Sequence, residues 1–169
     1  MAAFNVKGLS TLGVKVSYGV ETTAGTKPAT FTWLQRCDSI AGIEMPTENI
    51  DVSAIEDFAT AYTAGRQDSG GQWALGFNYT EEVEEMLTTM ISAYNTAKAA
   101  GKNIWFQIYH PTMSKGFFVI AEPPQLIPMP EMGQNEKMTV SITNTIVEYK
   151  GTSAKVLVAE DQTSGGGNG

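Results

Sequence analysis

The sequence predicts a mainly β domain of the α+β class, with one flanking helix at about residues 80–100 and one long loop at residues 47–71. Three observations lead to this prediction. β-branched and aromatic residues recur in short runs that alternate with period two, which is typical of strands. Only one segment has a strong helical period. The connection between two of the strands is far longer than those of most compact domains, and such a loop usually has a function.

The composition fits one domain that is large enough to bury a core: 169 residues, 17% charged, with a formal net charge of −7. Nucleic-acid-binding domains carry a basic surface, so the acidic balance argues against phosphate binding as the main task. The single cysteine, Cys37, excludes an internal disulfide framework and is expected to be a buried, reduced thiol. The first ten residues lack an apolar signal-peptide core, and no run of about 18 apolar residues occurs. We therefore expect a soluble protein made in a cytoplasm, without a membrane segment.

We expect three parts: an irregular N-terminal arm at residues 1–11, a single domain at residues 12–159, and a flexible, glycine-rich tail at residues 160–169. Within the domain, turn-rich and proline-rich connections separate the strands. Pro46 ends extended pairing before the long loop, because proline has no N–H to donate. The predicted strands cover residues 12–20, 31–34, 40–45, 72–79, 103–110, 116–122, 137–149 and 154–159.

Two of these strands have well-defined faces. Residues 72–79 place large apolar or aromatic side chains on one face, namely Trp73, Leu75, Phe77 and Tyr79. Residues 137–149 form the longest predicted strand, with an apolar row on one side, namely Met138, Val140, Ile142 and Ile146. The opposite side carries a row of hydroxyl groups, namely Thr139, Ser141, Thr143 and Thr145. Such a row predicts a sheet face in contact with water.

Residues 80–100 predict an amphipathic helix that lies against the sheet. Its packing face recurs at spacings of three and four residues and consists of Val83, Met86, Leu87, Met90 and Tyr94. Four glutamates crowd the first turns, where they complement the positive end of the helix macrodipole, namely Glu81, Glu82, Glu84 and Glu85. An acidic first turn is common in helices, so we assign no metal site there.

The sequence offers no constellation for catalysis. His110 is the only histidine, and its place at the end of an apolar strand predicts a strand-end hydrogen bond. A nucleophilic pair of Cys37 and His110 is the alternative, but the residues around Cys37 do not support it. Phosphate-binding glycine loops and the zinc-protease and serine-hydrolase motifs are missing from the sequence. We therefore predict no enzyme activity, no catalytic residues, no metal and no cofactor.

The long loop at residues 47–71 mixes acidic and apolar residues, and no helical or strand period holds throughout it. Its acids are Asp51, Glu56, Asp57 and Asp68, and its large apolar residues are Val52, Ile55, Phe58 and Tyr62. A monomer would expose that apolar surface, which soluble proteins usually bury. We expect the loop to pack on a neighbouring subunit.

This loop also carries a family resemblance. The run from Ile50 to Asp57, followed by Tyr62, Gly65, Asp68 and Gly70 and then by an alternating strand and a helix with an acidic start, resembles the major tail tube proteins of long-tailed (siphovirus-type) bacteriophages. The segment KGLSTLGVKVSYGVETTAG is similar to the start of the same family. The resemblance is strongest over residues 12–101 and extends to Tyr149.

The resemblance implies a β-sandwich of the tail-tube fold with one flanking helix. It implies a structural virion protein whose hexameric rings stack into a hollow tube, through which DNA passes into the host without specific binding. Its partners would be further copies of itself, the tape-measure protein, and tail-terminator and baseplate proteins. It would lie in the virion tail, and in the host cytoplasm before assembly. The loop residues implied to contact the next ring are Asp51, Val52, Ile55, Glu56, Phe58, Tyr62 and Arg66. No C-terminal immunoglobulin-like module is expected.

An acidic subunit suits a conduit for DNA. Six copies at −7 each carry 6 × −7 = −42 charges per ring. A lumen that is negative repels DNA from its wall and lets it slide. Candidate lumen residues are the hydroxyl side of strand 137–149 together with Glu136 and Glu148.

Two other functions stay open at this point. One is the tube protein of a contractile tail or secretion apparatus, which would form the same ring inside a sheath. The other is a β-sandwich carbohydrate-binding module, whose mark would be exposed aromatic residues on one rim. The three tryptophans, Trp33, Trp73 and Trp105, lie in predicted strands, where we expect core packing instead.

Overall fold

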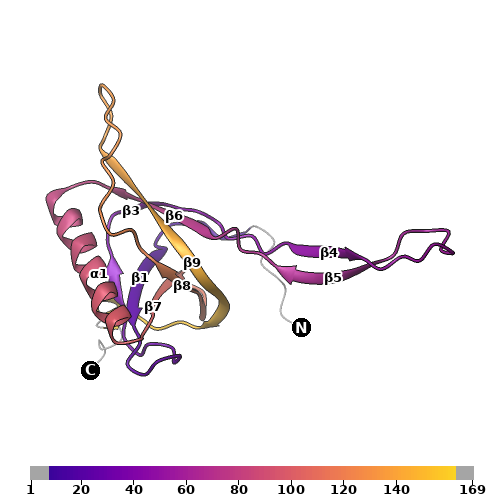
Figure 1. The fold of residues 1–169 in the computed structure, drawn as a ribbon. Coiled ribbons are helices and arrows are strands. Elements are labelled where there is room, and N and C mark those ends of the chain that lie inside the picture. The colour runs from indigo at the N-terminus through magenta and orange to yellow at the C-terminus, as the bar shows by residue number, and fades with distance from the viewer. Residues whose placement is uncertain (1–7, 163–169) are drawn as a thin grey trace.

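The computed structural model describes residues 8–162, so most of the predicted N-terminal arm and C-terminal tail lies outside the described residues. The mainly β fold with one long flanking helix is confirmed (Figure 1). The elements in chain order are β1 (Lys15–Val20), β2 (Thr32–Leu34), β3 (Cys37–Ile40), β4 (Thr47–Asp51), β5 (Tyr62–Gln67), β6 (Gln72–Asn78), α1 (Glu81–Ala99), β7 (Ile104–Tyr109), β8 (Lys115–Glu122), β9 (Thr139–Ala154) and α2 (Ala159–Gln162).

Seven of the strands in the described part of the chain form one antiparallel sheet, in the order β2-β1-β7-β8-β9-β6-β3. The strands β4 and β5 form a separate two-stranded sheet. The β-sandwich implied by the resemblance therefore takes the form of one continuous sheet, without a hydrogen-bond break between two layers.

This sheet is strongly curled. Its two edge strands, β2 and β3, are consecutive in the chain and are separated only by Gln35 and Arg36. Three residue steps span at most about 11 Å, so the two edges lie close together. The rings of Trp73 in β6 and Phe106 in β7 have centroids 5.6 Å apart, whereas a flat sheet would separate these strands by about 14 Å. The sheet is thus an incompletely closed barrel with a packed interior.

The helix α1 covers the barrel interior by the face that the sequence predicts. Val83, Leu87, Met90 and Tyr94 are buried in the main core, and Met86 is half-buried at its edge. The Sδ atom of Met86 accepts a hydrogen bond from the backbone N–H of Gln35 at 3.1 Å. The helix begins after Thr80, whose hydroxyl oxygen accepts from the Val83 N–H at 3.3 Å.

A second core lies on the outer side of β7 and β8. Strand β7 carries large side chains on both faces, and most of them are buried. Phe106 points into the barrel, while Trp105 and Tyr109 pack with Phe118 and Val158 in the second cluster. Residues 155–158 therefore cover the sheet on the side opposite the barrel interior.

Several predicted strand boundaries are wrong for local reasons. The first strand begins at Lys15, because Gly13 adopts a φ of 85° and Leu12 points to solvent. The predicted strand at residues 40–45 is replaced by β3, which ends at Ile40. The predicted strand at residues 154–159 is also wrong.

Strand β9 is longer than its period suggests, since it continues to Ala154. Its partner register shifts twice. Ala121 faces Ile146 and Ile120 faces Glu148, which leaves Val147 unpaired, and Val119 faces Tyr149 and Phe118 faces Gly151, which leaves Lys150 unpaired as a second β-bulge. Gly151 adopts a φ of 73° at that point. These bulges change the alternation from Val147 onward, so the sequence pattern weakens before the strand ends.

Sequence reasoning missed a buried carboxylate, because Glu21 is expected in a turn-rich loop and is instead 2% exposed. One carboxylate oxygen accepts a hydrogen bond from the Trp105 indole N–H at 2.8 Å. The other accepts from the backbone N–H groups of Gly25 at 3.0 Å and Asn103 at 3.1 Å. Burial raises the pKa of Glu21, but these hydrogen bonds outweigh burial and the net pKa is lowered. The carboxylate ties the loop after β1 to the start of β7.

Substitution of Glu21→Ala should lower the free energy of unfolding by roughly 1–3 kcal/mol, because three N–H donors lose their acceptor. The stabilisation by Glu21 is present above its ordinary pKa of 4.5 and is lost as pH falls through the lowered folded-state pKa. The difference between wild type and variant should therefore shrink on acidification. Urea unfolding at a series of pH values measures it, with exposed Glu85→Ala as the matched control. An equal effect of both substitutions would contradict the assignment.

Candidate functional site

The candidate site is a hairpin that projects from the barrel, comprising residues 47–71 and called here the long hairpin. Figure 1 shows it extending away from the body on the side opposite α1. The predicted irregular loop is thus partly wrong, since β4 and β5 pair in register from Thr47↔Gln67 to Asp51↔Tyr62. A register shift between Thr47 and Asn49 interrupts the ladder. The mixed composition hides the strand period because both faces of this ribbon meet solvent.

Local hydrogen bonds hold the tip of the long hairpin, residues 52–61. The Ser53 hydroxyl accepts from the Ala61 N–H at 2.7 Å, and the Val52 N–H donates to the Ala61 carbonyl at 3.0 Å. Asp57 accepts from the Ala54 N–H at 2.7 Å. Asp51 accepts from the Ser53 N–H at 2.8 Å, and this backbone hydrogen bond lowers the pKa of Asp51. The tip therefore presents its apolar side chains from a defined backbone.

The apolar side chains of the tip have no cover within the chain. Ile55 is 104% exposed and Phe58 is 108% exposed, which is as open as in an extended reference peptide. No residue of the long hairpin is buried, and none belongs to either hydrophobic core. The structure places all seven sequence-predicted interface residues on this one projection, exposed to solvent, namely Asp51, Val52, Ile55, Glu56, Phe58, Tyr62 and Arg66. Their contact with another subunit stays a prediction.

The substitutions Ile55→Ser and Phe58→Ser should leave the stability of the isolated subunit within about 0.5 kcal/mol of wild type, because neither side chain packs on the barrel. Phe106→Ala, at 0% exposure, should cost about 3–5 kcal/mol. Chemical denaturation of dilute protein measures both. A large loss of stability from the tip substitutions would show that the tip packs against the barrel in solution.

A second projection, residues 123–138, was missed as a candidate site because its prolines predict only a connection. Within the described residues its one ladder contact is a bridge between Glu131 and Thr139. It exposes four large apolar side chains, and we call it the methionine loop. These side chains are Leu126, Met129, Met132 and Met138. The sequence does hold a signal for this projection. Leu126, Met129 and Met132 recur among prolines, and because prolines disfavour strand pairing, no partner strand of the described chain covers these side chains.

The exposed face of β9 matches its prediction. Ser141, Thr143 and Thr145 face solvent, while Val140 and Ile142 are buried on the other side. Glu148 is also exposed and forms an ion pair with Lys150 at 3.0 Å. The barrel therefore has one long, hydroxyl-rich strand face that is open to water.

The residues with possible chemistry occupy structural positions. His110 forms the expected strand-end hydrogen bond, with 2.7 Å between its Nε2 atom and the Ser10 carbonyl oxygen. Cys37 is half-buried, and burial raises the pKa of its thiol to about 11. Residues 8–162 contain no cluster of three or more histidine, cysteine, aspartate or glutamate side chains arranged to hold a metal ion. Within the same range, no helix combines the length and the apolar character that a membrane span needs.

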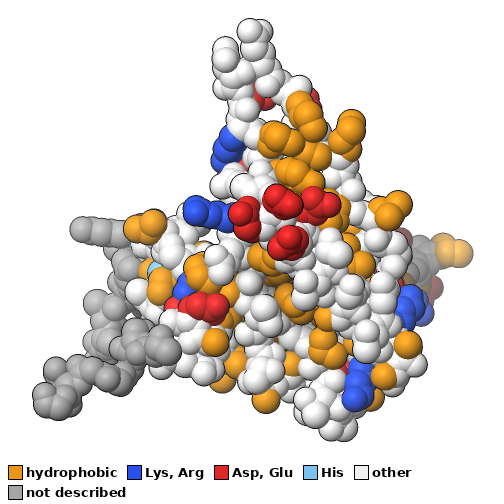
Figure 2. Space-filling view, turned by 90° about the vertical axis from the view of Figure 1, so that its left-hand side faces the viewer, with side chains coloured by type: hydrophobic (Ala, Val, Ile, Leu, Met, Phe, Trp, Pro, Cys, Tyr) orange, Lys and Arg blue, Asp and Glu red, His pale blue; other side chains and the backbone are white. Residues whose placement is uncertain are grey.

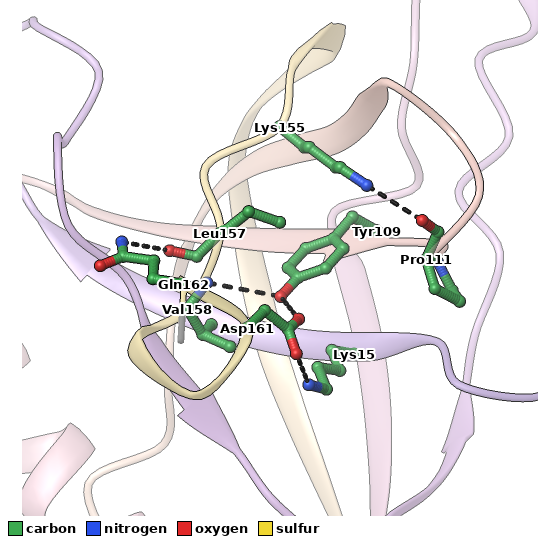
Figure 3. Close-up of polar contacts among 8 residues, drawn as sticks. All are labelled: Lys15, Tyr109, Pro111, Lys155, Leu157, Val158, Asp161 and Gln162. Atoms are coloured by element: carbon green, nitrogen blue, oxygen red, sulfur yellow. Dashed lines mark hydrogen bonds and ion pairs between the residues drawn. The ribbon is translucent and has the colours of Figure 1, made fainter. Parts of the chain in front are cut away.

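The segment that follows β9 is fixed to the barrel by a polar cluster (Figure 3). Asp161 of α2 accepts hydrogen bonds from the Tyr109 hydroxyl and the Lys15 ammonium group. The Tyr109 oxygen also accepts from the Val158 N–H at 3.4 Å. Burial raises the pKa of Tyr109, and so does the neighbouring Asp161. Burial opposes the charged form of Asp161, but Lys15 and Tyr109 outweigh it and lower the pKa of that carboxyl. The cluster holds Val158 in the second core.

Tyr109→Phe should release this segment, because it removes the hydroxyl that joins Val158 and Asp161. We expect a loss of about 1 kcal/mol in the free energy of unfolding and faster tryptic cleavage at Lys155. Tyr62→Phe is the matched control, since that tyrosine is exposed on the long hairpin. Unchanged cleavage in Tyr109→Phe would show that the second core alone fixes the segment.

No protein family matches this chain, and no curated protein does. Among solved structures it is similar to a chain in the six-fold symmetrised cryo-EM structure of the anti-feeding prophage baseplate. The two chains are 10% identical, and the match covers 85% of this chain and 94% of that chain with a TM-score of 0.47. A likeness of this size carries no conclusion about function.

Proposed function

We propose that this chain is a structural protein of a phage-type tail, which assembles into stacked hexameric rings that form a hollow tail tube. The observation that supports this most is the long hairpin, which carries Ile55 and Phe58 fully exposed at the end of a two-stranded ribbon. A ribbon of that kind gains little stability alone. Its exposed apolar tip is suited to burial against a neighbouring copy.

The body of the protein supports the same proposal. The barrel edges are the short strands β2 and β3, which lie next to each other in the chain. The barrel itself therefore offers little free edge for pairing with another copy. The long hairpin is directed away from α1, so a neighbour met by its tip lies beyond the body of the molecule (Figure 1). Contacts made by a projection on a different surface of the next copy are heterologous, and they generate rings or open-ended stacks.

The proposed tube carries DNA without binding it. The net charge of −7 gives each ring of six copies 6 × −7 = −42 charges. We assign the lumen to the exposed hydroxyl face of β9, with Glu148 farther along the same strand. Hydroxyl groups offer DNA weak contacts, and the negative charge repels its phosphates. The proposed partners are the tape-measure protein along the lumen and the tail-terminator and baseplate proteins at the tube ends. The proposed location is the virion tail, after a stage in the host cytoplasm.

The tube of a contractile tail or secretion apparatus is a variant of this proposal, because the same long hairpin would serve it. A sheath around the tube separates the two cases in electron micrographs of particles. Carbohydrate binding has less support. Trp73 and Trp105 are buried, and Trp33 is half-buried beneath Lys15, whose Nζ atom lies 4.3 Å from the ring centroid.

Negative-stain electron microscopy of concentrated protein tests the proposal. Wild type should form rings or hollow tubes, and the double variant Ile55→Ser/Phe58→Ser should reduce assembly at least tenfold while the subunit stays folded. Ile55→Leu/Phe58→Leu is the matched control, because it keeps the apolar surface and should keep assembly. A strictly monomeric wild type at high concentration, with or without tail proteins, would overturn the proposal.

A further inference from the structure

We propose that the methionine loop of one copy receives the tip of the long hairpin of a second copy, so that copies join head to tail. This inference rests on the function proposed above and names the surface on which the long hairpin docks. The occupant is a second copy of this chain, and the contact is between two apolar surfaces that each subunit exposes by itself.

The chemistry of the methionine loop suits a receiving surface. Leu126 is 83% exposed, Met129 is 86% exposed and Met132 is 63% exposed. Methionine side chains are unbranched and polarisable, so they adapt their shape to an aromatic or branched partner. Phe58 and Ile55 at the tip are partners of that kind. Each surface is a set of apolar side chains that an isolated subunit would leave exposed to water.

The two surfaces lie on different sides of the molecule. The long hairpin extends from the body on the side away from α1 (Figure 1). Figure 2 views the molecule from the α1 side and shows hydrophobic side chains gathered at the base of the upper projection, above an acidic cluster. By its colour in Figure 1, the upper projection is the chain between β8 and β9, which is the methionine loop. A projecting tip on one side and a receiving surface on another give a heterologous contact, which generates rings or open-ended stacks.

Charge also favours this pairing. The tip carries two acids, of which Asp57 binds the Ala54 N–H while Glu56 is exposed. Lys137, on the methionine loop, is exposed and lies 3.2 Å from Asp38. Asp38 belongs to β3, an edge strand of the barrel. Lys137 therefore lies on the side of the methionine loop that faces β3. A Glu56 carboxylate brought to this side would share the Lys137 cation with Asp38.

A second basic group lies at the same end of the sheet. The Asn78 N–H donates to the Arg36 carbonyl at 2.9 Å, and the Tyr79 N–H donates to the Met138 carbonyl at 2.9 Å. Arg36 and Met138 therefore flank the end of β6 from its two sides. The acidic start of α1 lies nearby, where it would repel Glu56. The tip should thus seat between Met129 and the basic residues, away from α1.

The competing surface is an apolar cavity of about 300 Å³ at the base of the long hairpin itself. Its lining includes Ile40, Ile43, Trp73, Ile108, Phe117 and Tyr149. Since this cavity lies beside the hairpin that would reach for its equivalent, two copies could exchange tips there around a two-fold axis. Such a contact is isologous and stops at a pair. A stack needs a one-way contact, in which the tip of each copy binds only the next copy, and the methionine loop suits this because it lies on a different side of the molecule from the long hairpin.

Mixed cysteine variants distinguish the two surfaces. In a Cys37→Ala background, chains carrying Phe58→Cys are mixed with chains carrying Met129→Cys, assembled and then oxidised. We expect disulfide-linked dimers at least tenfold above either chain alone. The matched control mixes Phe58→Cys with Ile43→Cys and should stay at background. Preferential cross-linking to Ile43→Cys, or tubes that form without the Met129→Cys cross-link, would overturn this inference and leave the proposed function intact.

A charge exchange provides a second measurement. Glu56→Lys should reduce the Met129→Cys cross-link several-fold, and Lys137→Glu on the receiving chain should restore it. An effect of Glu56→Lys that Lys137→Glu does not reverse would contradict the placement of the tip beside Lys137. If wild type forms neither rings nor tubes under any condition, the proposed function fails first and this inference fails with it.

Discussion

The architecture depends on one covalent constraint, which is the two-residue link of Gln35 and Arg36 between the edge strands β2 and β3. It obliges a seven-stranded sheet to curl until its first and last strands approach each other. The natural twist of strands makes that curl attainable. Large side chains then fill the interior from opposite walls, as Trp73 and Phe106 do, and α1 covers the part that the strands leave open. Short edge strands limit unwanted pairing of the barrel with other chains.

The elements that could be predicted from the sequence are those with one buried face. Strand β6 and helix α1 contact the core along a single side, so the burial pattern appears as a period of two or of about 3.6 residues. Strand order and curl could not be predicted, because no local pattern records that β2 and β3 are opposite edges of one sheet. Glu21 was missed for a related reason. The sequence around a buried glutamate does not differ from that around an exposed one, and only the three N–H groups that donate to its carboxylate distinguish it.

The exposure of the long hairpin was predicted from composition and resemblance more than from period, and its role as an interaction site stays a prediction. An apolar, acid-rich connection predicts an exposed interaction segment, and the structure places those residues on one projection. The pairing of β4 with β5 could not be predicted from the sequence, because neither face of that ribbon is buried and no period of two appears. The methionine loop could not be read either. Prolines dominate residues 123–130, and they conceal the exposure of Leu126 and Met129 behind the pattern of an ordinary connection.

The long hairpin shares no buried side chain with the barrel, and this separation has an evolutionary consequence. Substitutions at its tip are expected to leave the folding of the body unchanged, so the proposed recognition surface and the fold can vary independently. Under the proposed assembly, two related chains made in one cell need only diverge in these few solvent-facing positions, and in the positions that meet them, to avoid co-assembly. Few substitutions would therefore suffice to make assembly specific to one lineage.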